Sequence, residues 1–263
     1  MRNFKNAKKL AGYVASLLSS FVPALATADE ILVGVEDLSY YPHYTFDDGE
    51  YRGFGRALLD AWAEDRGHQL FFKPFPIKRL MLSLVNGEID LKYPDNRYWG
   101  QDVKAAKDVF YSEKVVEYID GLSVKPDLIG KGPVAVKKLG TLRGFTPWAW
   151  LDDIDAGDVE LSEVNTLSSL ISQTLLGRID AAYANVSVVQ YQLSQVGQSN
   201  MLQFDPGLKH TRDFYHLSSV GKPELIKDFD VWLLENQERV QKLKQQFGVL
   251  FPTSIHSHEP DIR

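Results

Sequence analysis

The sequence contains no cysteine, which excludes disulfide bonds, thiolate metal sites, cysteine nucleophiles and lipid attachment through a cysteine. Positive charge is also scarce, because 29 lysines and arginines face 35 acidic residues and leave a net charge of −6. A chain this acidic is a poor candidate for binding nucleic acid or an anionic membrane surface. Long apolar runs are missing too, since Leu10–Val22 is too short to cross a bilayer and no later run is longer.

The first residues have the pattern of an export signal. A basic start precedes the apolar run, and Ala26-Thr27-Ala28 offers small residues for cleavage. We therefore predict a signal peptide over residues 1–28 and a mature chain from Asp29. A cut before Thr27 and an uncleaved amphipathic anchor are the alternatives. The segment carries four positive charges and no acidic residue, so its removal lowers the net charge from −6 to −10. An exported chain without cysteine is most simply a free periplasmic protein.

A short pattern occurs twice, as Val85-Asn86-Gly87-Glu88-Ile89-Asp90 and as Leu175-Leu176-Gly177-Arg178-Ile179-Asp180. Each copy follows an amphipathic helical pattern and leads into an apolar stretch. Glycine adopts a positive φ at no steric cost, so each copy predicts a helix, a left-handed stop and a strand. A repeated unit of this kind indicates two similar α/β lobes with a cleft between them.

The remaining pattern alternates apolar runs with amphipathic stretches, which predicts an α/β fold with a mainly parallel sheet. Residues 36–48 are polar and aromatic, and they predict a loop. Thr146 followed by Pro147 predicts the start of a helix. Residues 223–247 predict one long charged helix. The other predicted strands are 31–35, 70–73, 115–124, 139–143, 179–184 and 214–220, and the other predicted helices are 54–66, 77–85 and 167–175.

The order and spacing of several short motifs over nearly the whole mature chain carry a resemblance. These motifs are Leu32-Val33-Gly34-Val35-Glu36-Asp37, Tyr41-Pro42, Tyr51-Arg52-Gly53-Phe54, Gly87-Glu88-Ile89-Asp90, Phe110-Tyr111-Ser112, Gly177-Arg178-Ile179-Asp180 and Gly221-Lys222-Pro223-Glu224-Leu225. With them the chain resembles type II periplasmic solute-binding proteins of the amino-acid-binding type, the bacterial extracellular solute-binding protein family 3. The resemblance implies two Rossmann-like lobes joined by two crossing strands. Lobe 1 would comprise residues 29–119 plus 206–263, and lobe 2 would comprise residues 120–205.

Ligands of open α/β sheets bind beyond the carboxyl ends of the strands, which selects the loops 36–44, 92–99, 143–147 and 183–187. In these loops the resemblance and the residue types together predict ligand contacts from Asp37, Tyr40, Tyr41, Tyr93, Asp95, Arg97, Trp99, Arg143, Phe145, Thr146 and Asn185. Two structural alternatives stay open, because Asp37 could cap a turn and the tyrosines could be packing residues.

Members of the resembled family that bind α-amino acids hold the ligand's carboxylate with the arginine of a Thr-x-x-x-x-Arg pattern. Here the threonine position holds Arg97, and the arginine position falls near Asp102. The family's aspartate for the ligand's ammonium is replaced by Asn185, which keeps hydrogen-bonding groups but loses the charge. Both halves of the clamp have changed, so we expect a ligand other than an ordinary α-amino acid.

Arg97 and Arg143 lie on two of the predicted cleft loops of an acidic chain. Arg143 also precedes the helix start predicted at Thr146, where free N–H groups favour an anion. With the surrounding aromatic residues, this favours a small organic anion with an apolar or aromatic body. The alternative is that both arginines form salt bridges with Asp95 or Asp102.

These inferences predict a monomeric, non-enzymatic periplasmic protein that delivers a small molecule to an inner-membrane ABC transporter. A binding protein that presents its ligand to a membrane sensor is one alternative. A dehydratase-like enzyme on the same scaffold is another, with Asp95 and Asp102 as candidate acids or bases. We expect no cofactor, no metal and no nucleic acid, since His256-Ser257-His258-Glu259 fits a polar tail better than a metal site.

Overall fold

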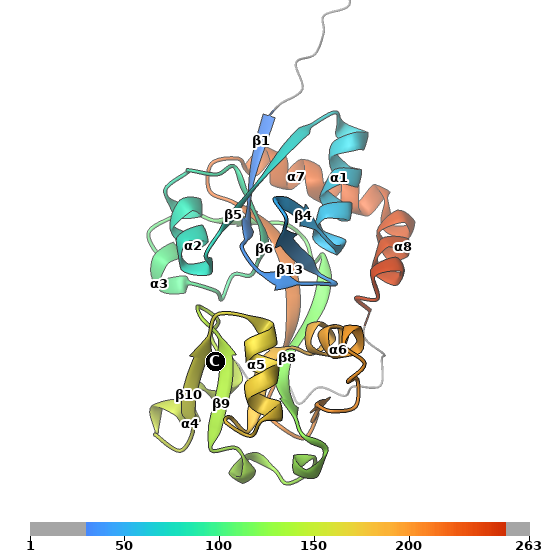
Figure 1. Ribbon diagram of the computed structural model, residues 1–263. Helices are drawn as coiled ribbons and strands as arrows, with labels where there is room; N and C mark the ends of the chain where they lie inside the picture. Colours follow the sequence, from blue (N-terminus) through green and yellow to red (C-terminus); the bar gives the residue numbers. More distant parts are fainter. Residues whose placement is uncertain (1–29, 251–263) are drawn as a thin grey trace, which may run out of the picture.

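The computed structural model describes residues 30–250, so the predicted signal peptide and the polar tail both lie outside the described residues. Strands and helices alternate along the chain as the sequence predicts (Figure 1). The strands are β1 (Glu30–Glu36), β2 (Ser39–Tyr40), β3 (Tyr44–Asp47), β4 (Glu50–Arg52), β5 (Gln69–Phe75), β6 (Leu91–Asp95), β7 (Phe110–Tyr111), β8 (Val116–Val124), β9 (Lys138–Leu142), β10 (Glu160–Val164), β11 (Ala181–Asn185), β12 (Gln203–Phe204) and β13 (Thr211–Ser219). The α-helices are α1 (Phe54–Arg66), α2 (Ile77–Val85), α3 (Gln101–Lys104), α4 (Leu151–Asp155), α5 (Leu167–Leu175), α6 (Val186–Gln195), α7 (Pro223–Glu235) and α8 (Gln237–Phe247).

One curled sheet runs through both lobes in the order β10-β9-β11-β8-β13-β6-β1-β5. The strands at each end pair in parallel, whereas the long strands β8 and β13 in the middle pair antiparallel with each other. Figure 1 shows these two strands passing from the upper to the lower part of the molecule. The fold is therefore α/β, with two Rossmann-like lobes joined by two crossing strands.

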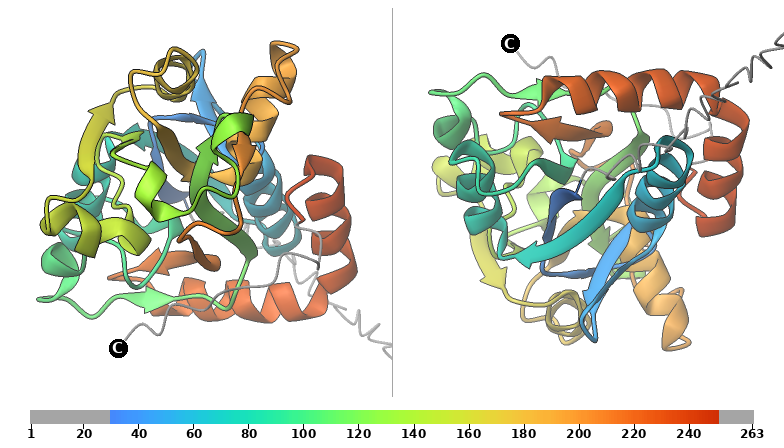
Figure 2. Two further views of the ribbon diagram at one scale, coloured as in Figure 1. Left: turned by 90° about the horizontal axis from the view of Figure 1, so that it is seen from below. Right: turned by 90° about the horizontal axis from the view of Figure 1, so that it is seen from above.

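The lobe boundaries at residues 119/120 and 205/206 stay a prediction. They fall close to a change of pairing in the sheet. Up to Asp120, strand β8 pairs with β13, and from Asp120 onward it pairs with β11. Figure 2 shows α7 and α8 wrapped around one side of the molecule. None of the helices within residues 30–250 is long and apolar enough to cross a membrane.

Both copies of the repeated motif form the predicted helix, glycine stop and strand. Gly87 after α2 has φ 70° and Gly177 after α5 has φ 68°. The aspartate that ends each motif ties its unit to the adjacent strand. The Asp90 carboxylate accepts a backbone N–H of β1 at 2.8 Å, and the Asp180 carboxylate accepts one of β9 at 2.8 Å. The two lobes therefore share the same local joint between helix and sheet.

The segment predicted as a loop over residues 36–48 contains strands β2 and β3, which form a second, three-stranded sheet with the following strand β4. Three tyrosines of this sheet, Tyr40, Tyr44 and Tyr51, are almost completely buried. Their apolar rings pack into the core, which outweighs the polar composition of the segment. The loop prediction was wrong because polar and aromatic composition was taken as a sign of irregular structure.

The helix predicted over residues 223–247 is two helices that break at Asn236. The Asn236 side chain donates to the Trp232 carbonyl at 3.0 Å, and its backbone is non-helical at φ −115° and ψ 27°. Asparagine side chains compete for backbone groups in this way, which ends α7 before α8 begins.

Candidate functional site

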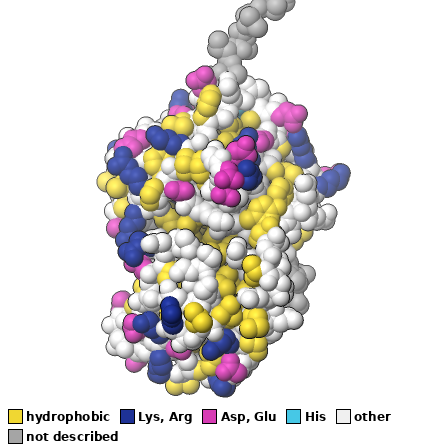
Figure 3. All heavy atoms as spheres, in the orientation of Figure 1, with side chains coloured by type: hydrophobic (Ala, Val, Ile, Leu, Met, Phe, Trp, Pro, Cys, Tyr) yellow, Lys and Arg dark blue, Asp and Glu magenta, His cyan; other side chains and the backbone are white. Residues whose placement is uncertain are grey.

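A cavity of about 460 Å³ lies where the two lobes face each other. In Figure 3 the waist between the lobes shows mainly hydrophobic and uncharged side chains, while most charged side chains lie farther out on both lobes. The cavity wall combines residues from β1, β3, α2, α3, the crossing strands and the loop after β9. The lining residues are Glu36, Tyr44, Ile77, Lys78, Met81, Leu82, Trp99, Gly100, Asp102, Val103, Asp120, Gly144, Phe145, Thr146, Trp148 and Tyr215.

Aromatic rings form much of this wall. The Trp99 ring lies 5.7 Å from Tyr215 of β13, and Phe145 makes an edge contact with Tyr40 at 5.4 Å. Trp148 is 40% exposed and lies on the same wall. Such rings offer flat apolar surface to a ligand and lose little side-chain entropy on binding.

Two acidic side chains stand among these rings. Glu36, at the end of β1, is 2% exposed and accepts a hydrogen bond from the Tyr44 hydroxyl. Asp120, in the middle of β8, has a buried carboxylate oxygen Oδ1 without a hydrogen-bond partner. Burial, and then the charge of Glu36, raise the pKa of Asp120 to about 7. The pKa of Glu36 is raised as well, chiefly by burial. The cavity therefore contains two carboxyl groups that are hard to ionise.

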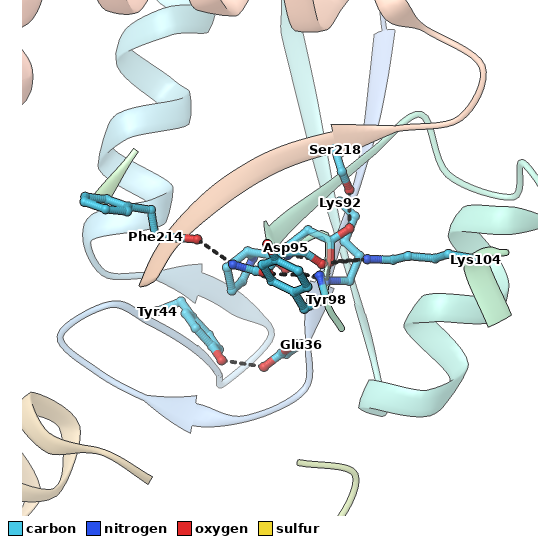
Figure 4. A network of polar contacts seen from close by, with 10 residues as sticks. Glu36, Tyr44, Lys92, Asp95, Tyr98, Lys104, Phe214 and Ser218 are labelled. Carbon is cyan, nitrogen blue, oxygen red and sulfur yellow. Dashed lines mark hydrogen bonds and ion pairs between the residues drawn. The ribbon is translucent and has the colours of Figure 1, made fainter. Parts of the chain in front are cut away.

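Figure 4 shows a buried ion network around Asp95. The Asp95 carboxylate accepts from Lys92 at 3.0 Å, from Lys104 at 2.7 Å and from the Ser218 hydroxyl at 2.6 Å. The Lys92 ammonium also lies 5.5 Å from the centre of the Trp99 ring. Burial alone would raise the pKa of Asp95, but the charges of both lysines and the hydrogen bonds from Lys104 and Ser218 together lower it. This network holds the loop from β6 to α3 in place.

No protein-family model and no curated protein sequence matches the chain. Solved structures do match it. An ancestral arginine-binding protein bound to arginine is 21% identical with a TM-score of 0.68, covering 83% of this chain and 97% of that one. The substrate-binding protein of an ABC uptake transporter from Streptococcus pneumoniae with bound histidine is 21% identical with a TM-score of 0.67, covering 83% and 92%. The ancestral amino-acid-binding protein AncCDT-1, a precursor of cyclohexadienyl dehydratase, is 18% identical with a TM-score of 0.65, covering 83% and 94%.

The chain has the two-lobe fold of the amino-acid-binding periplasmic proteins. At these identities the likeness concerns the fold, so the site has to be judged from its own residues. Three of the residues predicted to contact a ligand line the cavity. They are Trp99, Phe145 and Thr146.

The other aromatic and acidic candidates lie outside the cavity lining. Asp37 is exposed, on the opposite side of the strand end from Glu36. Tyr41 packs on Tyr191 with ring centres 4.5 Å apart. Tyr93 is 1% exposed, and Asp95 is engaged in the buried ion network.

The two arginines predicted to hold an anion are both exposed and absent from the cavity lining. Arg143 donates to the Asn165 side chain at 3.0 Å. Arg97 lies over the Tyr111 ring, 5.9 Å from its centre. The salt bridges considered as an alternative are not seen among the described ion pairs either, since Asp95 pairs with lysines.

Asn185, at the position of the family's ammonium-binding aspartate, is fully buried and already engaged. Its side-chain oxygen caps helix α6 by accepting the Ser187 backbone N–H at 2.9 Å. Its backbone N–H donates to the Tyr40 hydroxyl at 2.8 Å, and its amide lies 3.3 Å from His43 Nε2. Burial lowers the pKa of His43 to about 3, so this imidazole is neutral. The contacts of Asn185 with Tyr40 and His43 thus connect the two lobes.

The helix start predicted at Thr146 and Pro147 is wrong. Pro147 has a non-helical ψ of 70°, and a short 3₁₀ turn, Trp148–Trp150, follows it. Trp150 is fully buried and its indole N–H donates to the Lys209 carbonyl at 2.9 Å. This anchor fixes the chain in the turn. Helix α4 has only five residues, so the loop offers no anion site of the predicted kind.

The sequence did not lead us to expect Glu36, Asp120 and Tyr215 as lining residues, whereas Tyr44 belongs to the tyrosine cluster that we expected to stack on a ligand. For Asp120 a signal was present, because it is a lone acidic residue in the apolar segment Ile119–Val124. A charged residue inside a buried strand is rare unless it is paired or functional.

Proposed function

We propose that the protein is a solute-binding protein that holds one small organic molecule in the cavity between its lobes. The observation that carries the proposal is the cavity wall itself, which joins residues of α2 and β1 with those of β8 and the loop after β9. A ligand that contacts both walls favours their approach, which is how hinged two-lobe proteins close.

The ligand's body should be flat and apolar, because Trp99, Phe145, Trp148 and Tyr215 dominate the wall. An ordinary α-amino acid fits poorly. Where the amino-acid-binding pattern has its arginine the cavity has Asp102, and Asn185 is occupied by protein contacts. The anionic group expected from Arg97 and Arg143 is not part of the proposal, since neither side chain lines the cavity.

The setting we propose is the periplasm, reached through the signal peptide predicted over residues 1–28. The receiving partner would be an inner-membrane ABC permease. This is supported by the likeness to the substrate-binding protein of an ABC uptake transporter. A membrane sensor remains the alternative receiver.

The test is a thermal-shift screen of the exported form that begins at Asp29. The compounds would include amino acids, organic acids, amines, guanidines, aromatic acids and short peptides. A ligand at about 100 times its Kd stabilises the folded state by about 2.7 kcal/mol and raises the melting temperature. Phe145→Ala should abolish the shift produced by a hit. Phe71→Ala, the same change at an exposed ring outside the cavity, should keep it. A shift that survives Phe145→Ala would argue against this site.

An enzyme on the same scaffold is the second candidate. The buried carboxyl group of Glu36 and the partly buried one of Asp120 share the cavity, and the pKa of Asp120, near 7, suits a general acid or base. Likeness to a precursor of a dehydratase gives the idea additional support. Incubating the protein with each hit and following the compound by mass spectrometry decides the matter. If many equivalents of the compound are recovered unchanged, the protein binds the compound without converting it, and the enzyme candidate is rejected.

A further inference from the structure

Asp120 is the polar side chain in the molecule that most needs an explanation. It belongs to crossing strand β8, and its backbone pairs with Asn185 on one side and Thr211 on the other. The side chain lines the cavity, and its oxygen Oδ1 is buried without a hydrogen-bond partner. Buried carboxylate oxygens are normally bonded, because water has been removed from them at a considerable free-energy cost. An unbonded one on a cavity wall indicates a missing partner.

The groups around Asp120 form no described hydrogen bond with its oxygen Oδ1. Burial, and then the carboxyl group of Glu36, raise the pKa of Asp120. In addition to burial, the charge of Asp120 in turn raises the pKa of the hydroxyl groups of four tyrosines from β2, β8, β11 and β13. They are Tyr40, Tyr118, Tyr183 and Tyr215. None of the ion pairs within residues 30–250 includes the Asp120 or the Glu36 carboxylate. Both acids thus line the cavity without an ion-pair partner among these residues.

The cations that lie closest to this region are committed elsewhere or exposed. Lys92 donates to Asp95 at 3.0 Å and also to the Pro94 carbonyl. Lys78 lines the cavity but is exposed on α2. Burial raises the pKa of Glu36 more than the charge of Lys92 lowers it. Lys92 lies outside the cavity lining, and no buried cation of the described cavity wall forms an ion pair with Glu36 or Asp120.

The aromatic lining adds a second feature that favours positive charge. Trp99, Tyr44, Phe145 and Tyr215 all border the cavity. The faces of such rings attract cations within about 6 Å, and the attraction grows when water is excluded. Carboxylates enclosed by rings are the usual surroundings of a bound ammonium or guanidinium group.

We propose that the cavity recognises a ligand through a cationic group, an ammonium, amidinium or guanidinium, with Asp120 as its direct partner and Glu36 as the second carboxylate. This inference rests on the proposed binding function and specifies its ligand. The apolar body of the ligand packs on the rings, and the cation completes the bonding of Asp120.

The test compares three probes with one common body: 2-phenylethylamine, 2-phenylethanol and 3-phenylpropionate. Benzamidine and L-arginine test the amidinium and guanidinium forms. We expect the cationic probes to bind in calorimetry, and the alcohol and the acid to bind at least about tenfold more weakly. Asp120→Asn should weaken binding of the amine by roughly tenfold or more. The control Asp158→Asn changes an exposed aspartate that does not line the cavity and should leave the affinity unchanged.

A proton readout separates direct contact from a structural effect. Asp120 must lose its proton to pair with a cation, so the amine should bind with proton release near neutral pH, and more tightly as the pH rises from about 6 to about 8. Titrations in buffers of different ionisation enthalpy measure this release, which Asp120→Asn should remove. The melting temperature of the variant verifies that it folds.

The outcomes distinguish the two proposals. If the alcohol or the acid binds as tightly as the amine, or if Asp120→Asn leaves amine binding unchanged, the cation inference is wrong while the binding function stands. If the cationic probes do not bind, but a compound of another class in the broad screen does and loses its binding in Phe145→Ala, the cation inference is again wrong while the binding function stands. If no compound in either set binds, the proposed function itself is overturned.

Discussion

At the scale of single residues, two aspartates show how surroundings decide the state of the same group. Asp95 has two lysines and a serine hydroxyl as partners, and its pKa is lowered. Asp120 has an unbonded oxygen and a neighbouring acid, and its pKa is raised to about 7. The first carboxylate is part of the scaffold, and the second is available to a ligand.

Asp120→Asn should stabilise the ligand-free protein in a pH-dependent way. The pKa of Asp120 rises from its ordinary value of 3.8 to about 7 in the folded state, so the folded state holds this proton more tightly. Stability from this group is therefore complete below about pH 4 and is lost as the pH rises through about 7. Since the side chain borders the cavity, we expect the free energy of unfolding of the variant to exceed that of the parent protein by about 1–3 kcal/mol at about pH 8, and by much less at about pH 5.

Chemical denaturation of both proteins at these two pH values measures the difference. A variant advantage that is equal at both pH values, or larger in acid, would show that Asp120 is ionised without penalty. Asp158→Asn serves as the matched control, because this aspartate is exposed.

Asp95→Asn should be strongly destabilising. The change leaves Lys92, which is fully buried, and Lys104 without their shared counter-charge. Breaking a buried ion pair from one side costs about 3–5 kcal/mol. Glu160→Gln removes one partner of the exposed Lys138–Glu160 pair and should cost under about 1 kcal/mol. Urea denaturation of the two variants compares them directly, and equal losses would refute the account of the network.

At the scale of elements, the loop after β9 decides how closely the lobes can approach. Gly144 on this loop has φ 95°, and a Cβ atom there would lie 3.2 Å from Ile77 of helix α2. The loop belongs to the lower part of the molecule in Figure 1 and α2 to the upper part. Glycine thus serves two needs here, a left-handed backbone and close passage past the opposite lobe.

Gly144→Ala should weaken binding of a hit from the screen by about tenfold, because the new methyl group opposes closure over the cavity. The φ of 95° would add strain of about 1–3 kcal/mol whether the lobes are open or closed. Adding Ile77→Gly removes the Cβ atom of residue 77, which the new methyl group would meet at 3.2 Å. Partial recovery of affinity in the double variant, measured by calorimetry, is the expected result. No recovery would assign the whole effect to backbone strain.

At the scale of the whole molecule, the order of strands and helices could be predicted from the sequence, because hydrophobic period and glycine stops are local signals. The stops at Gly87 and Gly177 are examples. The break at Asn236 and the packing of Tyr40 could not be predicted in this way, because each depends on a competing contact made in three dimensions.

The candidate site was predicted less completely than the fold. Alternation along β1 indicated that Glu36 and Asp37 point to opposite sides, but it could not tell which side is the cavity. Long side chains such as Arg97 and Arg143 can turn from a loop into solvent, so their position in the sequence did not place them in the cleft. The role of Asp120 depends on a crossing strand that only the assembled sheet brings to the cavity.

A single small molecule that bridges the two lobes would leave a clear pattern in hydrogen–deuterium exchange measured with and without the best compound of the screen. We expect simultaneous protection of β8 around Asp120, the loop 143–148 and residues 77–103, with the outer helices α7 and α8 unchanged. Protection limited to one lobe, or centred on α7 and α8, would contradict binding between the lobes.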